Sequence, residues 1–125
     1  MAKAEGRVFP MEPVDRIDAS YLETFPYQGP NQEIRLEYPE FTTVCPFSGL
    51  PDFANVILVY TPARKCIELK SLKYYFLTYR NVGIYQEAVT ARVHRDLKAV
   101  LRPRRLSVTT VYNPRGGLNA TCTVK

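Results

Sequence analysis

Hydrophobic and polar residues alternate along several segments, and this pattern predicts four β-strands. In residues 33–38 charged side chains separate the apolar ones, as expected for a strand with one buried face. Residues 54–60 (ANVILVY) form a nearly continuous apolar run, which is typical of a well-buried strand. Residues 106–112 (LSVTTVY) are rich in β-branched side chains, and residues 118–124 alternate strictly. Two further strands are therefore expected there.

Apolar residues at helical spacing predict two helices between these pairs of strands. Residues 71–79 (SLKYYFLTY) predict a short helix, and residues 85–101 predict a longer one that Pro103 ends. The apolar side of the first helix consists of Leu72, Phe76 and Tyr79, and that of the second of Val89, Val93, Leu97, Val100 and Leu101.

The order strand, strand, helix, helix, strand, strand predicts an α+β fold. Two helices can cover one face of a four-stranded antiparallel sheet, which leaves the other face and both sheet edges open. Open edges favour pairing with another chain, so we expect several copies to assemble, with sites at subunit junctions. Residues 1–32 are rich in proline and lack a sustained period. We interpret them as an arm that packs on the surface or on another subunit, and residues 33–125 as the folded domain.

Charge is unevenly distributed along the 125 residues, whose formal net charge is +5. Residues 1–44 carry 4 basic and 8 acidic side chains, whereas residues 64–105 carry 11 basic and 3 acidic ones. The basic segment could face a phosphorylated partner, such as a nucleotide or nucleic acid, or it could be an ordinary solvated surface.

The cysteines and the apolar runs indicate a reducing, cytoplasmic setting. Cys45, Cys66 and Cys122 are an odd number without CxxC spacing, which argues against a disulfide framework and against a cysteine-rich metal site. The first ten residues do not resemble a signal peptide, and no apolar stretch approaches the ~20 residues that a membrane span needs. We expect Cys66 and Cys122 to be core thiols.

The stretch YPEFTTVCPFSGLPDF places a thiol, Cys45, and a carboxylate, Asp52, on what we interpret as one bent loop. A thiol becomes a nucleophile when its pKa falls or when a base takes its proton, and a nearby acid can return a proton. The single histidine, His94, has no evident path to Cys45, which disfavours a protease. On the loop alone, an ordinary buried thiol remains an equal alternative.

Four segments make the sequence similar to the 7-cyano-7-deazaguanine reductases (QueF), the NADPH-dependent nitrile reductases of queuosine biosynthesis in tRNA modification. These segments are the stretch around Cys45, ELKSLKYY, YRNVGIYQEAV and NPRGG, and the likeness runs over residues 22–115. The family's signature Glu-(Ser/Leu)-Lys-(Ser/Ala)-x-Lys-x-(Tyr/Phe/Trp) is matched by Glu68, Leu69, Lys70, Ser71, Lys73 and Tyr75. The resemblance implies the tunnelling fold with order ββααββ and a homo-oligomer of stacked pentameric rings with active sites between subunits.

The same resemblance implies a reaction, in which the nitrile of 7-cyano-7-deazaguanine is reduced to an aminomethyl group with two NADPH as co-substrate. Cys45 would attack the nitrile carbon to form a thioimide, and Asp52 would be the proton donor. No nucleic acid is needed, and no residue is assigned to a metal site.

Binding residues are also implied by the resemblance. Those for the substrate are Ile67, Glu68, Leu69, Gln86 and Glu87, with the Glu87 carboxylate accepting two N–H groups of the base. Those for the dinucleotide are Lys70, Ser71 and Lys73, with Arg115, Gly116 and Gly117 as further candidates. The sequence lacks a GxGxxG after a strand, so Rossmann-type binding is not expected. Glu87 could instead only stabilise a helix start, and the two glycines could only form a turn.

One position departs from the family pattern, because Gln86 stands where the family usually has histidine. Glutamine can exchange hydrogen bonds with a substrate but cannot shuttle protons near neutral pH. We expect His94 to be a structural or surface residue and not a substitute.

Two alternative functions remain. An amidinotransferase-like relative would form the same thioimide but add ammonia in place of hydride. A basic module would bind RNA through residues 64–105, whose arginines and lysines are interleaved with tyrosines at positions 74, 75 and 79.

Overall fold

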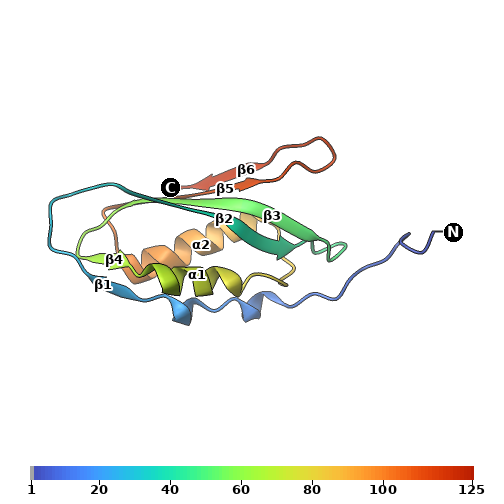
Figure 1. Cartoon of the computed structure of the whole chain (residues 1–125), viewed down its shortest axis with the longest axis horizontal. Helices are drawn as coiled ribbons and strands as arrows, with labels where there is room; N and C mark the ends of the chain where they lie inside the picture. Colours follow the sequence, from blue (N-terminus) through green and yellow to red (C-terminus); the bar gives the residue numbers. More distant parts are fainter. Residues whose placement is uncertain (1) are drawn as a thin grey trace.

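A computed structural model, which describes residues 2–125, shows a four-stranded antiparallel sheet with two helices on one face (Figure 1). The sheet order is β2-β3-β5-β6, so each strand pairs with its neighbour along the chain in that series. These elements are β2 (Ile34–Val44), β3 (Pro51–Thr61), α1 (Leu69–Leu77), α2 (Gln86–Leu101), β5 (Arg105–Tyr112) and β6 (Thr121–Val124). The predicted α+β class and the helix coverage of one face are confirmed.

The core lies between the sheet and the two helices. Every second residue of β3 is buried, from Asp52 to Tyr60, because strand side chains alternate between faces. The longer helix α2 buries Val89, Val93 and Leu97 against this face, and β5 adds Val108. Each such side chain removes apolar surface from water at about 25 cal/mol per Å², which is the main term that holds the layers together.

The N-terminal segment packs against the helices of the same chain. Ile17 and Leu22 are buried in the core cluster. Strand β1 (Thr24–Pro26) pairs antiparallel with β4 (Lys65–Ile67), which forms a second, two-stranded sheet that the sequence did not predict. Two short 3-10 helices, Val14–Arg16 and Ala19–Tyr21, precede this strand.

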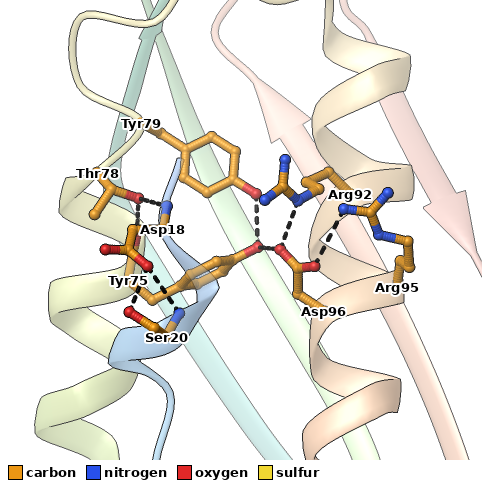
Figure 2. A network of polar contacts seen from close by, with 8 residues as sticks. All are labelled: Asp18, Ser20, Tyr75, Thr78, Tyr79, Arg92, Arg95 and Asp96. Carbon is orange, nitrogen blue, oxygen red and sulfur yellow. Dashed lines mark hydrogen bonds and ion pairs between the residues drawn. The ribbon is translucent and has the colours of Figure 1, made fainter. Parts of the chain in front are cut away.

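Figure 2 shows a hydrogen-bonded network that joins α1 to α2. The carboxylate of Asp96, which is 8% exposed, accepts the Tyr75 hydroxyl at 2.7 Å and the Arg92 Nε–H at 2.7 Å. The hydroxyls of Tyr75 and Tyr79 lie 2.7 Å apart. Beside this network, the N–H of Asp18 donates to the Thr78 hydroxyl at 3.1 Å and connects the N-terminal segment to the end of α1.

Several element boundaries differ from the sequence prediction, and strand β2 continues to Val44, beyond the predicted residues 33–38. Strand β3 begins at Pro51 and not at residue 54, so Asp52 is a strand residue and not part of the bent loop. Helix α1 begins two residues early, because the Glu68 side chain accepts the N–H groups of Lys70 and Ser71 and caps the helix. Strand β6 begins only at Thr121, after a longer turn. In residues 2–125 no helix is both long and apolar enough to cross a membrane.

Candidate active site

The loop between β2 and β3 holds Cys45 in a tight turn. The N–H of Cys45 donates to the Leu50 carbonyl at 2.8 Å, and the N–H of Gly49 donates to the Cys45 carbonyl at 2.8 Å. Gly49 has a φ of 73°, and a Cβ there would collide with the Phe9 backbone. Glycine is therefore required where the N-terminal segment crosses the loop. The Phe9 N–H donates to the Ser48 carbonyl at 2.8 Å and holds the segment at this crossing.

The turn surrounds the Cys45 sulfur with hydrogen-bond donors. Partial burial is the largest single influence and raises the pKa of the thiol. The backbone N–H groups of Phe47 and Ser48, the Ser48 hydroxyl and the Arg115 guanidinium oppose it, and together they hold the pKa of Cys45 below its ordinary value of 9.0. A half-buried thiol with a lowered pKa has the features of a nucleophile.

Asp52 lies on the helix-covered face of the sheet, at the same end as Cys45. It pairs with Thr43 of β2 and is only 4% exposed. The Arg115 guanidinium, carried by the turn between β5 and β6, forms an ion pair with its carboxylate. Burial raises the pKa of Asp52 and outweighs the lowering by Arg115. A carboxyl group with a raised pKa keeps its proton to higher pH, as a proton donor must.

The start of α2 lies at this same end. The N–H of Ile84 donates to the Val44 carbonyl at 3.3 Å, so the segment before α2 runs beside the residue that precedes Cys45. The rings of Phe47 and Tyr85 lie 6.0 Å apart, edge to face. Gln86 is half-buried and Glu87 is exposed in the first helical turn. The chain thus brings both residues to the end of the molecule that carries Cys45, Asp52 and Arg115.

Strand β4 and the start of α1 lie at the opposite end (Figure 1), and they hold Ile67, Glu68 and Leu69. The Lys65 ammonium, on the adjoining strand β4, donates to the Val100 carbonyl in the last turn of α2 at 3.3 Å. The 16 residues of α2 therefore separate the two groups by about 24 Å. Glu68 also caps α1, with 2.9 Å and 2.8 Å bonds from the N–H groups of Lys70 and Ser71. A single chain does not bring the two halves of the predicted substrate site together.

The residues predicted for the dinucleotide fall into three settings. Lys70 and Lys73 are exposed on α1, and Lys70 lies 5.7 Å from the centroid of the Tyr74 ring. Ser71 is buried, and its hydroxyl donates to the Glu68 carbonyl at 2.7 Å and accepts the Glu23 N–H at 3.0 Å. Arg115 belongs to the Cys45 end, on a turn where Gly116 and Gly117 have φ values of 57° and 82°. The role of each in cofactor binding stays a prediction.

Two residues of this end were missed from the sequence. Ser48 was interpreted only as part of the turn, although its hydroxyl supports Cys45 and accepts the Leu50 N–H at 3.2 Å. Tyr112 was interpreted only as a strand residue. The sequence did offer a signal, because Tyr112 and Thr110 fall on the same, inner face of β5. Polar groups buried on a core face need hydrogen-bond partners.

Comparisons with known proteins agree with these features. A family model described as QueF-like protein matches residues 51–125. The NADPH-dependent 7-cyano-7-deazaguanine reductase of Thermotoga maritima is 51% identical over 122 residues, which cover 97% of this chain and 89% of the relative. The enzyme of the same name from Chlorobium chlorochromatii is 48% identical over 105 residues, covering 82% and 90%.

The fold has also been observed before. A crystal structure of the archaeosine synthase QueF-Like in the apo form superposes with a TM-score of 0.71 and 23% identity, over 78% of this chain and 94% of that chain. At this level of identity the likeness supports the fold alone. The family match and the relatives together show that the chain belongs to the QueF-like protein family.

Proposed function

We propose that this protein is an NADPH-dependent nitrile reductase that converts 7-cyano-7-deazaguanine into 7-aminomethyl-7-deazaguanine in queuosine biosynthesis, in the cytoplasm. The observation that carries the proposal is the pairing of a thiol of lowered pKa, Cys45, with a buried carboxyl group of raised pKa, Asp52, through one arginine. The names of the relatives at about half identity supply the substrate and the reductant.

The first step uses the opposite pKa shifts of the two groups. The Cys45 sulfur attacks the nitrile carbon and forms an S–C bond, while one π bond of the C≡N group breaks. Asp52 supplies the proton that the nitrile nitrogen then needs, and the product is a thioimide on Cys45. A nitrile carbon becomes a good hydride acceptor only after this addition, because its nitrogen is then protonated and the carbon is trigonal.

NADPH would supply one hydride to this carbon in each of two reductions. The carbon–sulfur bond breaks after the first, which returns the sulfur to Cys45, and each reduction also requires one proton at nitrogen. Asp52 is the buried acid of the site, and Arg115 stabilises its carboxylate each time the proton leaves.

The chain offers a surface that fits the phosphates of the dinucleotide. Lys70 and Lys73 lie one turn apart on α1, and neither takes part in an ion pair within residues 2–125. Lys73 also lines a mostly apolar cavity between α1 and β2, together with Leu69 and Tyr38. Free ammonium groups beside an apolar cavity suit a ligand with phosphates at one end and a flat ring at the other.

The separation of the two binding regions supports an assembly of several copies. Glu68 and Lys70 of one chain cannot reach its own Cys45, so a neighbouring subunit would supply them. Strands β2 and β6 form the free edges of the described sheet. Large apolar side chains are exposed around the Cys45 end, namely Phe47, Leu50, Phe53, Tyr85 and Leu118. Free edges and exposed apolar groups are features of subunit interfaces, and stacked pentameric rings would cover both.

The test is to incubate the purified protein with 7-cyano-7-deazaguanine and to follow NADPH absorbance. We expect two NADPH to be consumed for each nitrile, and none with the Cys45→Ala variant. A mass spectrum of protein mixed with the nitrile alone should show a Cys45-dependent adduct. No oxidation by the wild-type protein would overturn the proposal.

An amidinotransferase-like activity is the remaining candidate, since it would start from the same adduct. The mass spectrum separates the two, because only a reductase clears the adduct when NADPH is added, whereas the alternative enzyme clears it with ammonia.

A further inference from the structure

The hydroxyl of Tyr112 is one of two buried side-chain polar atoms in residues 2–125 without a hydrogen-bond partner, the other being Asn55 Oδ1. Tyr112 is 3% exposed and lies at the C-terminal end of β5, directly opposite Ala54 of β3. An unpaired buried hydroxyl costs about 1–3 kcal/mol, so proteins rarely keep one without a use.

The sheet and α2 place this hydroxyl among the residues of the Cys45 end. Asp52 is two residues from Ala54 on the same face of β3, and Thr43 pairs with Asp52. The hydroxyls of Thr90 and Thr110 meet at 2.7 Å. Helix α2 leads directly into β5, so the two elements run in opposite directions. Tyr112, two positions beyond Thr110, therefore lies toward the start of α2, which carries Glu87.

The charges around Tyr112 agree with this placement. Burial, followed by the negative charges of Asp52 and Cys122 and, more weakly, of Glu87, raises the pKa of Tyr112 far above its ordinary 10.0. The Thr43 hydroxyl lies near enough to oppose this rise, but it does not meet the geometry of a hydrogen bond with the Tyr112 hydroxyl. The phenol therefore keeps its proton at every pH at which the protein works, and it can act only as a neutral hydrogen-bond donor or acceptor.

The geometry of the base shows what such a donor would meet. If Glu87 accepts the N–H groups of the pyrimidine edge and Cys45 attacks the nitrile, both groups lie along one side of the ring system. The carbonyl oxygen of 7-cyano-7-deazaguanine stands on that side, between the ring N–H and the carbon that bears the nitrile. A donor between Glu87 and Asp52 would face this oxygen.

We propose that the Tyr112 hydroxyl donates a hydrogen bond to the carbonyl oxygen of the bound base and is a further substrate-binding residue. This inference rests on the proposed function. It explains why the free chain leaves the hydroxyl unpaired, since the partner arrives with the substrate. It also gives the site a means to reject bases that lack the carbonyl, because the hydroxyl would then stay unsatisfied.

The test uses Tyr112→Phe in a Cys45→Ala background, where binding is measured without chemistry. By calorimetry, we expect binding of 7-cyano-7-deazaguanine to weaken about 10-fold, the order of one lost hydrogen bond in a buried site. Binding of the analogue without the carbonyl, 7-cyano-7-deaza-2-aminopurine, should change less than twofold. Tyr27→Phe, a half-buried tyrosine whose hydroxyl accepts the Gln32 side-chain N–H, is the control and should bind both ligands normally.

Thermal unfolding of the ligand-free protein supplies a second measurement. Removing an unpaired hydroxyl should leave the melting temperature of Tyr112→Phe unchanged or higher. Equal weakening toward both ligands, unchanged binding of the natural base, or a lower melting temperature with normal binding would each overturn the inference. If the wild-type protein did not reduce the nitrile, the proposed function would be overturned instead. The two failures are therefore distinguishable.

Discussion

Arg115 and Asp52 form an ion pair across 63 residues of sequence, and the same guanidinium also lowers the pKa of the Cys45 thiol. One cation therefore acts on both the thiol and the carboxyl group. In the proposed reaction its charge would stabilise the thiolate of Cys45 before attack and the carboxylate of Asp52 after proton transfer. The turn between β5 and β6 would then take part in the reaction, in addition to connecting the strands.

Arg115→Gln tests this shared role. Removal of the positive charge should raise the pKa of Cys45 toward its ordinary value and raise that of Asp52 further, because Arg115 lowers both. The pH profile of Cys45 alkylation by iodoacetamide, with Cys45→Ala as background, should shift to higher pH. We expect turnover to fall about 10²-fold or more, the usual size of a lost electrostatic contact. Arg64→Gln, another exposed arginine, is the control, and equal profiles for the two variants would contradict the shared role.

Much of the fold could be predicted from the sequence, because it depends on local periods. The 85–101 helix and the β5 strand needed only the spacing of their own side chains and an ending signal such as Pro103. The two-stranded sheet was missed, since TFP and KCI are too short to show a period. Asp52 was assigned to a loop, because a charged residue at a buried strand position breaks the apolar pattern that identifies strands.

The site was predictable only in part, for a different reason. The residues were named from a resemblance, whereas their partners follow from sheet register and burial. No local pattern could show that Arg115 bonds Asp52, or that the Tyr112 hydroxyl lies unpaired beside Thr43. Such contacts depend on strands that meet far apart in the sequence.

Asp52→Asn should separate stability from function. The folded protein holds the pKa of Asp52 above 3.8, so the unfolded chain binds fewer protons and stability falls as pH rises from about 3.8 through the raised pKa. Above that window the charged carboxylate costs stability, which the neutral amide avoids. At pH 8 we expect the free energy of unfolding of the variant to be about 0.5–2 kcal/mol higher than that of the wild type. Arg115 loses its ion-pair partner in this variant, but it is half exposed, so water solvates its charge.

The pH series provides the check on Asp52. The stability gain of Asp52→Asn should shrink as the pH is lowered toward 3.8, where the wild-type carboxyl group is protonated. Nitrile reduction should fall about 10²-fold or more, because an amide cannot supply the proton. A variant that is less stable than the wild type at pH 8 would show that the ion pair with Arg115 outweighs burial.

The network in Figure 2 predicts the largest loss of stability away from the site. Asp96→Ala removes the acceptor of the Tyr75 hydroxyl and of the Arg92 Nε–H. The Arg92 Nε–H then loses its partner between α1 and α2, and the Tyr75 hydroxyl keeps only its contact with Tyr79. We expect the free energy of unfolding in urea to fall by about 3 kcal/mol. Asp96→Asn, which keeps one acceptor oxygen, should lose less. Equal losses for the two variants would mean that packing and not hydrogen bonding decides the effect.

Mixed oligomers test whether the two ends of the molecule act together between subunits. Cys45→Ala removes the nucleophile at one end and Lys70→Ala removes a dinucleotide contact at the other, about 24 Å away along α2. Each variant alone should be nearly inactive. If neighbouring subunits share a site, random mixing at equal amounts places an intact Cys45 beside an intact Lys70 in about a quarter of the junctions, so activity should recover to that fraction. Recovery is measured after the two variants are unfolded and refolded together, so that subunits of both kinds can enter one assembly. A refolded mixture that stays inactive, when the wild-type protein regains activity by the same refolding, would contradict a site shared between neighbouring subunits. Normal activity of Lys70→Ala alone would mean that Lys70 has no part in the site.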